Sequence, residues 1–326
     1  MLLGELLGAA GESNLLGPAE WSSSISDDKT PIEFSVAYDV TGERAVRLLG
    51  EAVCASTARE FLDNMASRLN LYTGKLDAVQ DLFLPERPSG DFVLWYSMIF
   101  RSGSPPVFKV YLNPHARGAE NSSDLVAEAL GRLGMRNVHK AVVDHALTRG
   151  DKDTFSFFAL DLNRTPKSRV KLYVSHESAE TDDVERAAAL VPGINPMQIR
   201  EFCAVLGGGK GPFVHRPLIS SYSFVEGDTA TPSNYSLYLP VRDYVPDDEV
   251  ARARLVAVMA QYNMDTAELD RSLRAVTARP LRDGVGLIPH VSLRLGAVGS
   301  GITVYLSSEA FSVTPPRQRP VLGLVS

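Results

Sequence analysis

The sequence is poor in the residues that build disulfide frameworks and metal centres. Its 326 residues include only two cysteines, Cys54 and Cys203, and six histidines, with no CxxC motif and no Cys/His spacing typical of metal ligands. We therefore expect neither a disulfide framework nor a structural zinc site. The first residues, MLLGELLGAAGES, have no basic region and too short an apolar run for a signal peptide.

Long apolar runs and clusters of positive charge are also scarce. No apolar run reaches the ~18 residues typical of a transmembrane helix. The 33 Lys and Arg residues against 39 Asp and Glu give a net charge of −6, without any Lys/Arg-rich segment, so nothing draws the whole molecule to nucleic acid or an anionic membrane. We expect one cytosolic domain over residues 1–326, because an apolar content of 44% supports a sizeable core.

Several common catalytic motifs are missing as well. There is no GxSxG sequence, and the acidic pairs Asp182–Asp183 and Asp247–Asp248 lack the DDxxD spacing that holds magnesium on a diphosphate. Both pairs are typical of the acidic first turn of a helix. The run Gly207–Gly211 fails the spacing of a phosphate loop and is interpreted as a linker. His290 is expected to line a cavity or pack in the core rather than to act as a base.

What the sequence does contain is a fivefold repeat. A polar or basic residue, followed two positions later by a large side chain, recurs with separations of 62, 62, 65 and 67 residues. The five copies begin at Arg47, Lys109, Lys171, Ser236 and Thr303. Such near-constant spacing indicates that one structural unit is repeated along the chain.

Each copy is predicted to be the second strand of a β-hairpin. The runs that precede the copies are rich in Phe, Tyr, Val, Ile and Ser, alternate partially, and are followed by turn residues. These predicted first strands are Ile32–Asp39, Phe92–Phe100, Phe155–Leu162, Ile219–Glu226 and Leu287–Arg294. Apolar residues at three- and four-residue steps predict helices between the hairpins. The helical ranges are Ser56–Leu71, Ser122–Leu133, Asp182–Leu190, Asn195–Leu206, Asp247–Tyr262 and Thr266–Thr277.

These elements predict an α+β fold of five units, each with two helices and two antiparallel strands. Only Leu2–Ala10 precedes the first strand, so the first unit is expected to be shortened. Ten antiparallel strands lose their exposed edges by closing into a barrel, with the helices packed outside. Strand alternation places Lys109 with Tyr111 on one face. Because charges are costly to bury against helices, we place this face in the lumen.

Four cations are expected to meet in that lumen: Arg47, Lys109, Arg169 and Lys171. Together they would bind a compact polyanion such as a diphosphate, and would stabilise it as a leaving group. The alternative is that they are solvent-facing strand residues paired with acids on neighbouring strands.

Four tyrosines share the register of these cations. They are Tyr111, Tyr173, Tyr238 and Tyr305, each two residues after the polar position of its repeat. A ring of tyrosine faces would shield an allylic carbocation from water while tolerating its charge. Any one of them could instead be an ordinary core aromatic.

One carboxylate interrupts the apolar alternation of the first predicted strand. Glu33, in Thr30-Pro-Ile-Glu-Phe-Ser35, could accept a hydrogen bond from an N–H group of a substrate, or take part in removing a proton. The alternative is a glutamate neutralised by a cation of the lumen such as Arg47.

With these motifs in order, the sequence resembles the indole prenyltransferases of the ABBA fold (dimethylallyltryptophan synthase type, bacterial branch). The motifs, besides the segment around Glu33, are Lys109-Val-Tyr111-Leu-Asn-Pro, Arg169-Val-Lys171-Leu-Tyr173, Tyr238-Leu-Pro-Val-Arg-Asp-Tyr and Val304-Tyr305-Leu-Ser-Ser-Glu. The resemblance runs from Leu2 to about Phe311.

The resemblance implies a metal-independent alkylation, in which dimethylallyl diphosphate ionises and the indole of tryptophan or a tryptophan derivative attacks. Glu33 then matches the glutamate that binds the indole N–H, and the four cations and four tyrosines match the diphosphate clamp and the tyrosine shield. Arg44 competes with Arg47 for the first clamp position, and the spacing favours Arg47. The implied partners are small-molecule substrates, with no magnesium or other cofactor, in a monomer or homodimer.

The acceptor site is less defined. Trp95, Phe157, Ala159 and Arg294 are candidate pocket residues. The predicted strand Phe92–Phe100 lacks the lysine of fungal enzymes that alkylate indole C4, which favours C5, C6, C7 or N1. Phe155–Leu162 lacks the arginine that holds the tryptophan carboxylate in some fungal members. Two alternatives remain open, namely a phenolic or other non-indole acceptor in the same barrel, and a non-catalytic barrel that binds an amphipathic anion.

Overall fold

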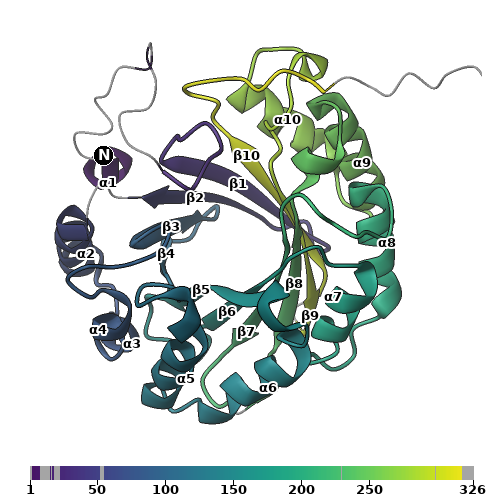
Figure 1. Ribbon diagram of the computed structural model, residues 1–326. Coiled ribbons are helices and arrows are strands. Elements are labelled where there is room, and N and C mark those ends of the chain that lie inside the picture. Colours follow the sequence, from purple (N-terminus) through teal and green to yellow (C-terminus); the bar gives the residue numbers. More distant parts are fainter. Residues whose placement is uncertain are drawn as a thin grey trace, which may run out of the picture.

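The computed structural model describes residues 2–7, 15, 17, 23–51, 55–228, 230–297 and 299–317, so Cys54 lies outside the described residues. At its centre the described strands form a closed antiparallel barrel, in the order β1-β10-β9-β8-β7-β6-β5-β4-β3-β2, and helices surround it (Figure 1). The strands are β1 Ile32–Asp39, β2 Arg44–Glu51, β3 Leu94–Phe100, β4 Val107–Leu112, β5 Asp153–Asp161, β6 Val170–His176, β7 Leu218–Phe224, β8 Asn234–Leu239, β9 Val291–Gly296 and β10 Gly301–Ser307. The predicted ten-stranded barrel of five hairpins is confirmed.

The helices lie between the hairpins and pack around the barrel. They are α1 Leu2–Leu7, α2 Ala55–Leu69, α3 Gly74–Asp77, α4 Gln80–Phe83, α5 Ser122–Arg132, α6 Arg136–Ala146, α7 Thr181–Ala188, α8 Pro196–Gly207, α9 Asp248–Gln261 and α10 Thr266–Val276. Short 3-10 helices cover Ala119–Asn121, Gly150–Lys152, Val241–Tyr244 and Leu281–Asp283. No helix among the described residues is long and apolar enough to cross a membrane.

Local signals start and stop these helices as the sequence suggests. The side chain of Asn195 accepts from the backbone N–H of Met197 at the start of α8, with Pro196 in the first turn. Asp247 and Asp265 cap α9 and α10 in the same way. Gly208, at φ +78°, ends α8 in the left-handed conformation. The glycine run after α8 is therefore a helix stop and linker, as predicted.

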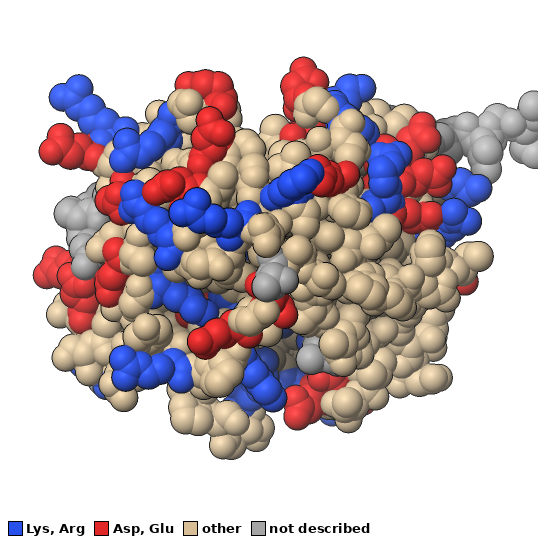
Figure 2. Space-filling model, turned by 90° about the horizontal axis from the view of Figure 1, so that it is seen from below, with Lys and Arg blue, Asp and Glu red and all other residues tan. Residues whose placement is uncertain are grey.

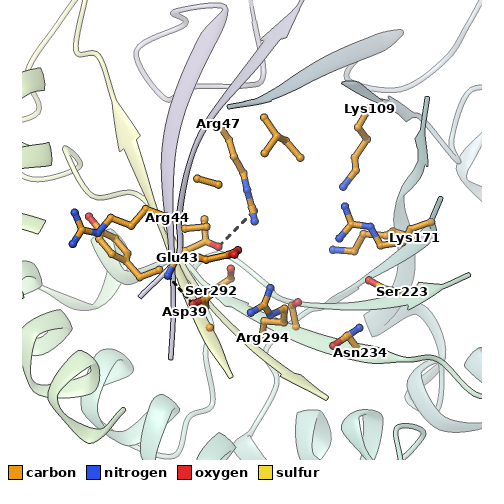
Figure 3. A pocket seen from close by; sticks show the side chains of 18 of the residues that line it. Asp39, Glu43, Arg44, Arg47, Lys109, Lys171, Ser223, Asn234, Ser292 and Arg294 are labelled. Carbon is orange, nitrogen blue, oxygen red and sulfur yellow. Dashed lines mark hydrogen bonds between the residues drawn. The ribbon is translucent and has the colours of Figure 1, made fainter. Parts of the chain in front are cut away.

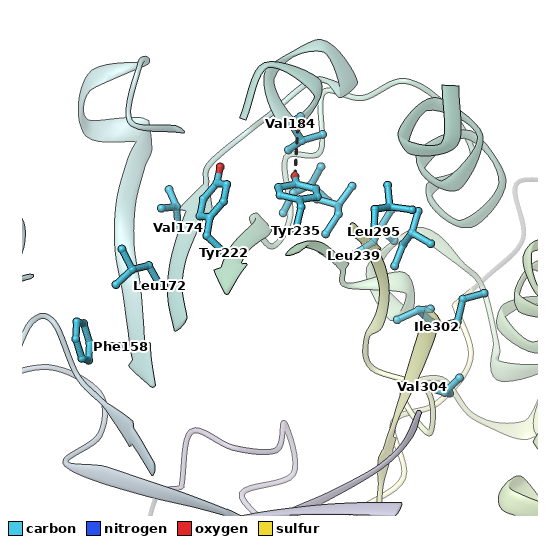
Figure 4. Packing of buried hydrophobic residues seen from close by; sticks show 14 of the residues in the cluster. Phe158, Leu172, Val174, Val184, Tyr222, Tyr235, Leu239, Leu295, Ile302 and Val304 are labelled. Carbon is cyan, nitrogen blue, oxygen red and sulfur yellow. Dashed lines mark hydrogen bonds between the residues drawn. The ribbon is translucent and has the colours of Figure 1, made fainter. Parts of the chain in front are cut away.

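The barrel wall separates an apolar outer layer from a polar lumen. Alternate residues of each strand point outward and pack under the helices, among them Leu172, Tyr222, Tyr235 and Val304 (Figure 4). Tyr222 and Tyr235 are fully buried, and their hydroxyls donate to carbonyls of α7. Over one side of the molecule, charged side chains of both signs are interspersed, without a large field of one sign (Figure 2).

A buried polar chain lies in the same outer layer. Asp153 Oδ1 is 2.8 Å from Nδ1 of His176, whose Nε2 is 2.9 Å from the hydroxyl of Ser220, which is in turn 2.8 Å from that of Tyr235. All four side chains are buried, so each polar atom depends on its neighbour. The chain ties β5, β6, β7 and β8 together across four strands.

The two ends of the barrel differ. At the hairpin end, loops of different lengths join the two strands of each hairpin. At the helix end, where the helical connections attach, residues 23–31 form what we call the N-terminal strap. Its Ile25 packs with Phe92 and Trp95, beside β3, and its Asp27 pairs with Arg216, just before β7. Because β3 and β7 stand on opposite sides of the barrel, the strap spans this opening.

Two strand boundaries differ from the prediction for a physical reason. The fifth hairpin begins at Val291 rather than at Leu287, because the backbone N–H groups of Leu287 and Ile288 donate to the buried Asp248 carboxylate instead of a neighbouring strand. The second hairpin begins at Leu94 rather than at Phe92, whose carbonyl accepts from the Asn113 side chain.

Candidate active site

A cationic cavity of about 410 Å³ occupies the hairpin end of the lumen (Figure 3). Arg47 from β2, Lys109 from β4 and Lys171 from β6 point toward one another across it. Arg169, which the sequence places on a strand, sits just before β6 but also lines the cavity. The structure therefore brings together the four predicted cations.

Arg44 also lines the cavity, but its guanidinium is directed differently from the charged groups of the four cations. It points away from the cavity centre, toward α10, where its Nη1 lies 2.7 Å from the Glu268 carboxylate. Arg47 contacts Thr303 Oγ1 at 3.5 Å, across β1 and at the edge of the cavity. The spacing argument that preferred Arg47 thus agrees with the position of the two side chains.

Asp161, which sequence reasoning missed, joins two of the cations. Its carboxylate is 3% exposed, lies 2.7 Å from Nε of Arg169, and is 3.5 Å from Nζ of Lys109. These two positive charges hold the pKa of Asp161 down, to about 2, against the effect of its burial. The predicted alternative of cations paired with acids is thus partly seen, although the Lys109 pair is buried in the lumen and only the Arg169 side chain is partly exposed.

The two lysines are the electrostatically strained members of the site. Lys109 and Lys171 are only 6% and 7% exposed. Burial lowers the pKa of Lys109 to about 7, and the nearby Arg169 and Arg47 add to this while Asp161 opposes it. Burial, Lys109 and Arg169 together hold the pKa of Lys171 well below its usual value. Cations gathered with too few counter-charges are suited to bind a polyanion.

Sequence reasoning also missed further polar residues of this cavity. Arg101, Ser223 and Asn234 line it beside the predicted cations. Arg294, which was predicted to contact the acceptor, also lines this cavity. On β9 it lies two residues closer to the hairpin end than Ser292, the residue that pairs with Tyr238 of the tyrosine layer. Alternation along β3, β7, β8 and β9 identifies them as lumen residues once the register is known.

The four predicted tyrosines lie side by side next to the cations. Ring centroids are 5.8 Å apart for Tyr111 and Tyr173, 5.8 Å for Tyr173 and Tyr238, and 5.9 Å for Tyr238 and Tyr305. Lys171 Nζ is 4.9 Å from the centre of the Tyr173 ring. Burial raises the pKa of Tyr111 to about 12, so its hydroxyl stays neutral. Neutral rings of the kind in this tyrosine layer have π faces that can contact a cation.

A cluster of further aromatics, Phe92, Trp95 and Phe157, adjoins the tyrosine layer on the β3 and β5 side. Trp95 stacks on Phe92 with centroids 4.3 Å apart, and Phe157 lies 5.3 Å from Trp95 and 5.6 Å from Tyr173. Ala159 is fully buried between Tyr111 and Lys171 in the strand pairing. Three of the four predicted pocket residues therefore lie in one continuous wall.

Glu33 lies on β1, two residues before Ser35 in the chain and so nearer to the helix end. Ser35 pairs with Tyr305 of the tyrosine layer. Glu33 is thus on the helix-end side of the tyrosine layer, opposite the cations. Burial raises its pKa to about 8, and Arg216 is the charge that opposes this rise. The cation predicted to neutralise it, Arg47, lies instead at the hairpin end.

His290 lies just before β9, with its ring 6.4 Å from that of Tyr305. Burial lowers its pKa to about 3, so it is neutral at physiological pH. Within the described ranges, no three His, Cys, Asp or Glu side chains come together as possible metal ligands.

The lumen thus holds a cationic cavity, a layer of tyrosine rings beside it and the buried carboxylate of Glu33. This arrangement, in a closed barrel ringed by helices, defines the class of aromatic prenyltransferases with the ABBA fold. A family model described as tryptophan dimethylallyltransferase matches residues 93–273.

Solved structures of dimethylallyltryptophan synthases are similar to this chain in sequence and in fold. The chain is 50% identical to a 6-dimethylallyl tryptophan synthase, with a TM-score of 0.93 over 98% of this chain and 92% of the other. It is 49% identical to the 6-dimethylallyltryptophan synthase from Micromonospora olivasterospora in complex with DMASPP and Trp (TM-score 0.93, covering 97% and 92%). It is 35% identical to the 5-dimethylallyl tryptophan synthase from Streptomyces coelicolor (TM-score 0.88, covering 98% and 91%). The chain belongs to the tryptophan dimethylallyltransferase family and is a prenyltransferase that acts on the indole ring.

Proposed function

We propose that this enzyme transfers the dimethylallyl group of dimethylallyl diphosphate to C6 of free L-tryptophan, without a metal ion. The observation that carries the choice of C6 is the 50% and 49% identity to two 6-dimethylallyltryptophan synthases, against 35% to the 5-synthase. The order of groups along the lumen supports the chemistry.

In this proposal the cationic cavity holds the donor. Arg47, Lys109, Arg169 and Lys171 bind the diphosphate and stabilise the negative charge that develops as its bond to the allylic carbon breaks. The cations supply the charge that a metal would otherwise supply. The tyrosine layer then faces the allylic cation, stabilises it through π contacts and keeps water away.

The acceptor occupies the other side of the tyrosine layer. Glu33 accepts the indole N–H and raises the electron density of the ring, while Trp95 and Phe157 bound the space beside it. Carbon C6 attacks the allylic carbon, whose bond to the diphosphate oxygen has broken. An oxygen of the departing diphosphate takes the C6 proton, which restores the aromatic ring. Only an ionised Glu33 is a full acceptor, so its raised pKa predicts that turnover increases with pH toward about 8.

The deciding experiment is incubation with L-tryptophan, dimethylallyl diphosphate and excess EDTA, followed by NMR of the product. We expect 6-dimethylallyltryptophan at a rate that EDTA does not change. Loss of activity with the chelator would contradict the metal-free mechanism, and a product substituted elsewhere on the ring would contradict the choice of C6. A parallel panel of phenolic acids and naphthalenediols tests the non-indole alternative, which requires turnover of those compounds without turnover of tryptophan.

A further inference from the structure

Asp161 lies behind the wall of the cationic cavity. Its two partners, Lys109 and Arg169, line the cavity, whereas Asp161 is not one of the lining residues. Its carboxylate is buried and lies 3.5 Å from Nζ of Lys109 and 2.7 Å from Nε of Arg169. A negative charge next to a site for an anion weakens binding, so this carboxylate needs a role other than holding the donor.

The β5–β6 hairpin holds this carboxylate in a fixed place. Asp161 is the last residue of β5, directly opposite Lys109 on β4, and Arg169 comes just before β6. The backbone N–H of Asp161 donates to the carbonyl of Arg169 at 3.0 Å. In return, the backbone N–H of Arg169 donates to the Asp161 carboxylate at 3.1 Å, while the Asp161 carbonyl accepts from the hydroxyl of Ser168 at 3.2 Å. Because the carboxylate replaces a backbone carbonyl in the pairing of the two strands, it is anchored independently of any ligand.

A fixed negative charge discriminates among anions by their charge. It repels a bound anion in proportion to the charge that the anion carries, so each further negative charge on the ligand lowers the affinity again. At a separation of about 6 to 10 Å and an effective dielectric constant of about 20, one additional unit charge changes a binding constant by about 10- to 100-fold. Asp161 therefore acts most strongly on the most highly charged ligand of the cationic cavity.

The product diphosphate is that ligand. When the bond from the diphosphate oxygen to the allylic carbon breaks, the oxygen keeps the electron pair, and the diphosphate then takes the proton from C6 of the indole. The cations around it lower the pKa of the protonated oxygen, so the proton passes on to water and the diphosphate carries one more negative charge than the donor. Four cations without a counter-charge would thus hold the product more tightly than the donor and stop the next round.

We propose that Asp161 is a positioning residue of the donor site, whose fixed charge limits the affinity of the cationic cavity for the product diphosphate and so permits its release. This inference rests on the proposed function, because it takes the donor and the product from that reaction. Asp161 acts through Lys109 and Arg169, which bind the ligand in the proposed mechanism, and it orients Arg169 by accepting from both its side chain and its backbone. The site is thus balanced to bind a diphosphate ester and to lose a free diphosphate.

The test compares two ligands in the same protein. The dissociation constants of inorganic diphosphate and of dimethylallyl thiolodiphosphate, an analogue of the donor, are measured by calorimetry at pH 8 with EDTA, which keeps metal ions off both ligands. Their ratio is independent of the state of the free enzyme, because both ligands start from the same protein with the same protonation of Lys109. Asp161→Asn keeps the shape of the side chain and removes its charge, and it should shift the ratio by about 10-fold in favour of inorganic diphosphate.

The matched control is Asp153→Asn, at the other end of the same strand. Asp153 is also a buried carboxylate that pairs with an arginine, Arg149 at 2.6 Å, but it lies in the outer layer, so the ratio should not change. A ratio that is unchanged in Asp161→Asn, or that shifts toward the donor analogue, would overturn the proposal, since a merely structural role of Asp161 would weaken both ligands alike.

A second pair of variants covers the case in which Asp161→Asn does not fold, because it leaves Lys109 and Arg169 without their counter-charge. The ratio is then compared between Lys109→Gln and Lys109→Gln/Asp161→Asn. Removing one of the two cations relieves their repulsion, and the same shift toward inorganic diphosphate is expected. If the analogue did not bind to the wild-type enzyme, the proposed function would be refuted and this inference with it, whereas an unchanged ratio overturns this inference alone.

Discussion

Binding of the donor should draw protons into the protein. Lys109 has a pKa of about 7 in the free enzyme, so at pH 8 about 0.9 of the molecules carry it as a neutral amine. A bound diphosphate places negative charge beside the amine and raises its pKa, so the bound lysine is charged. Lys109 therefore takes up about 0.9 proton at pH 8 and only about 0.1 at pH 6. Lys171, whose pKa burial also holds well below its usual value, adds to this uptake.

This coupling between proton uptake and donor binding also sets how the affinity for the donor changes with pH. Because the complex holds more protons than the free enzyme, the donor binds more weakly as pH rises above the free pKa of Lys109. Each lysine that must be charged contributes up to about tenfold per pH unit, until the pH reaches its pKa in the complex. Arg47 and Arg169 stay charged over this range and contribute to affinity but not to its pH dependence.

Isothermal titration calorimetry measures the uptake directly. Dimethylallyl thiolodiphosphate is a suitable ligand, since its terminal phosphate has a pKa near ~6 and is already ionised at pH 8. The binding enthalpy is measured at pH 8 in buffers of different ionisation enthalpy, and the slope of that plot is the number of protons bound. Lys109→Arg should reduce the slope by about 0.9, since arginine stays charged.

The control is Lys140→Arg, at a lysine whose side chain is 79% exposed on α6, and it should leave the slope unchanged. An enthalpy at pH 8 that is independent of the buffer would refute the reasoning. So would a slope that is unchanged in Lys109→Arg.

The remaining predictions concern the acceptor carboxylate and the packing of the helix end. Glu33→Gln should lower kcat by about 10²- to 10⁴-fold with an unchanged circular dichroism spectrum, and a rate within about threefold of the wild type would contradict its role. Asp248→Asn should destabilise the protein by about 3–5 kcal/mol in urea unfolding, because the buried carboxylate pairs with Arg279 and accepts from three backbone N–H groups. Tyr222→Phe removes only a buried hydroxyl and should cost about 1 kcal/mol, and an equal loss in both variants would count against a special role for Asp248.

The barrel could be predicted from the sequence because several independent features of each repeat indicate the same β-hairpin. Each copy combines strand alternation, turn residues and a polar position in one register, and closure into a barrel follows from the lack of any parallel crossover. The helix α6, Arg136–Ala146, was not predicted, because no side chain caps its start and its buried residues Val138, Val142 and Ala146 recur only at every fourth position.

The cations and tyrosines of the donor side were found from the same 62- to 67-residue spacing, and their roles in binding the donor stay predictions. Asp161 could not be found this way, because a carboxylate before a turn is usually solvated, and only the closed barrel places it between Lys109 and Arg169. Arg216 and Asp27 were missed for a related reason. They lie outside the strands, where no spacing connects them, and only the path of the strap brings them together.

The pairing of β1 with β10 has a consequence for synthesis of the chain. Seven residue pairs, from Glu33–Ser307 to Asp39–Gly301, join the first strand to the last, so this seam can form only after nearly the whole described chain has left the ribosome. Until then β1 and the latest strand to emerge are both unpaired edges, which are prone to pair with other chains. Arg47 and Thr303 meet across this seam, so a chain that ends before β10 would lack both a sealed wall and a complete donor pocket.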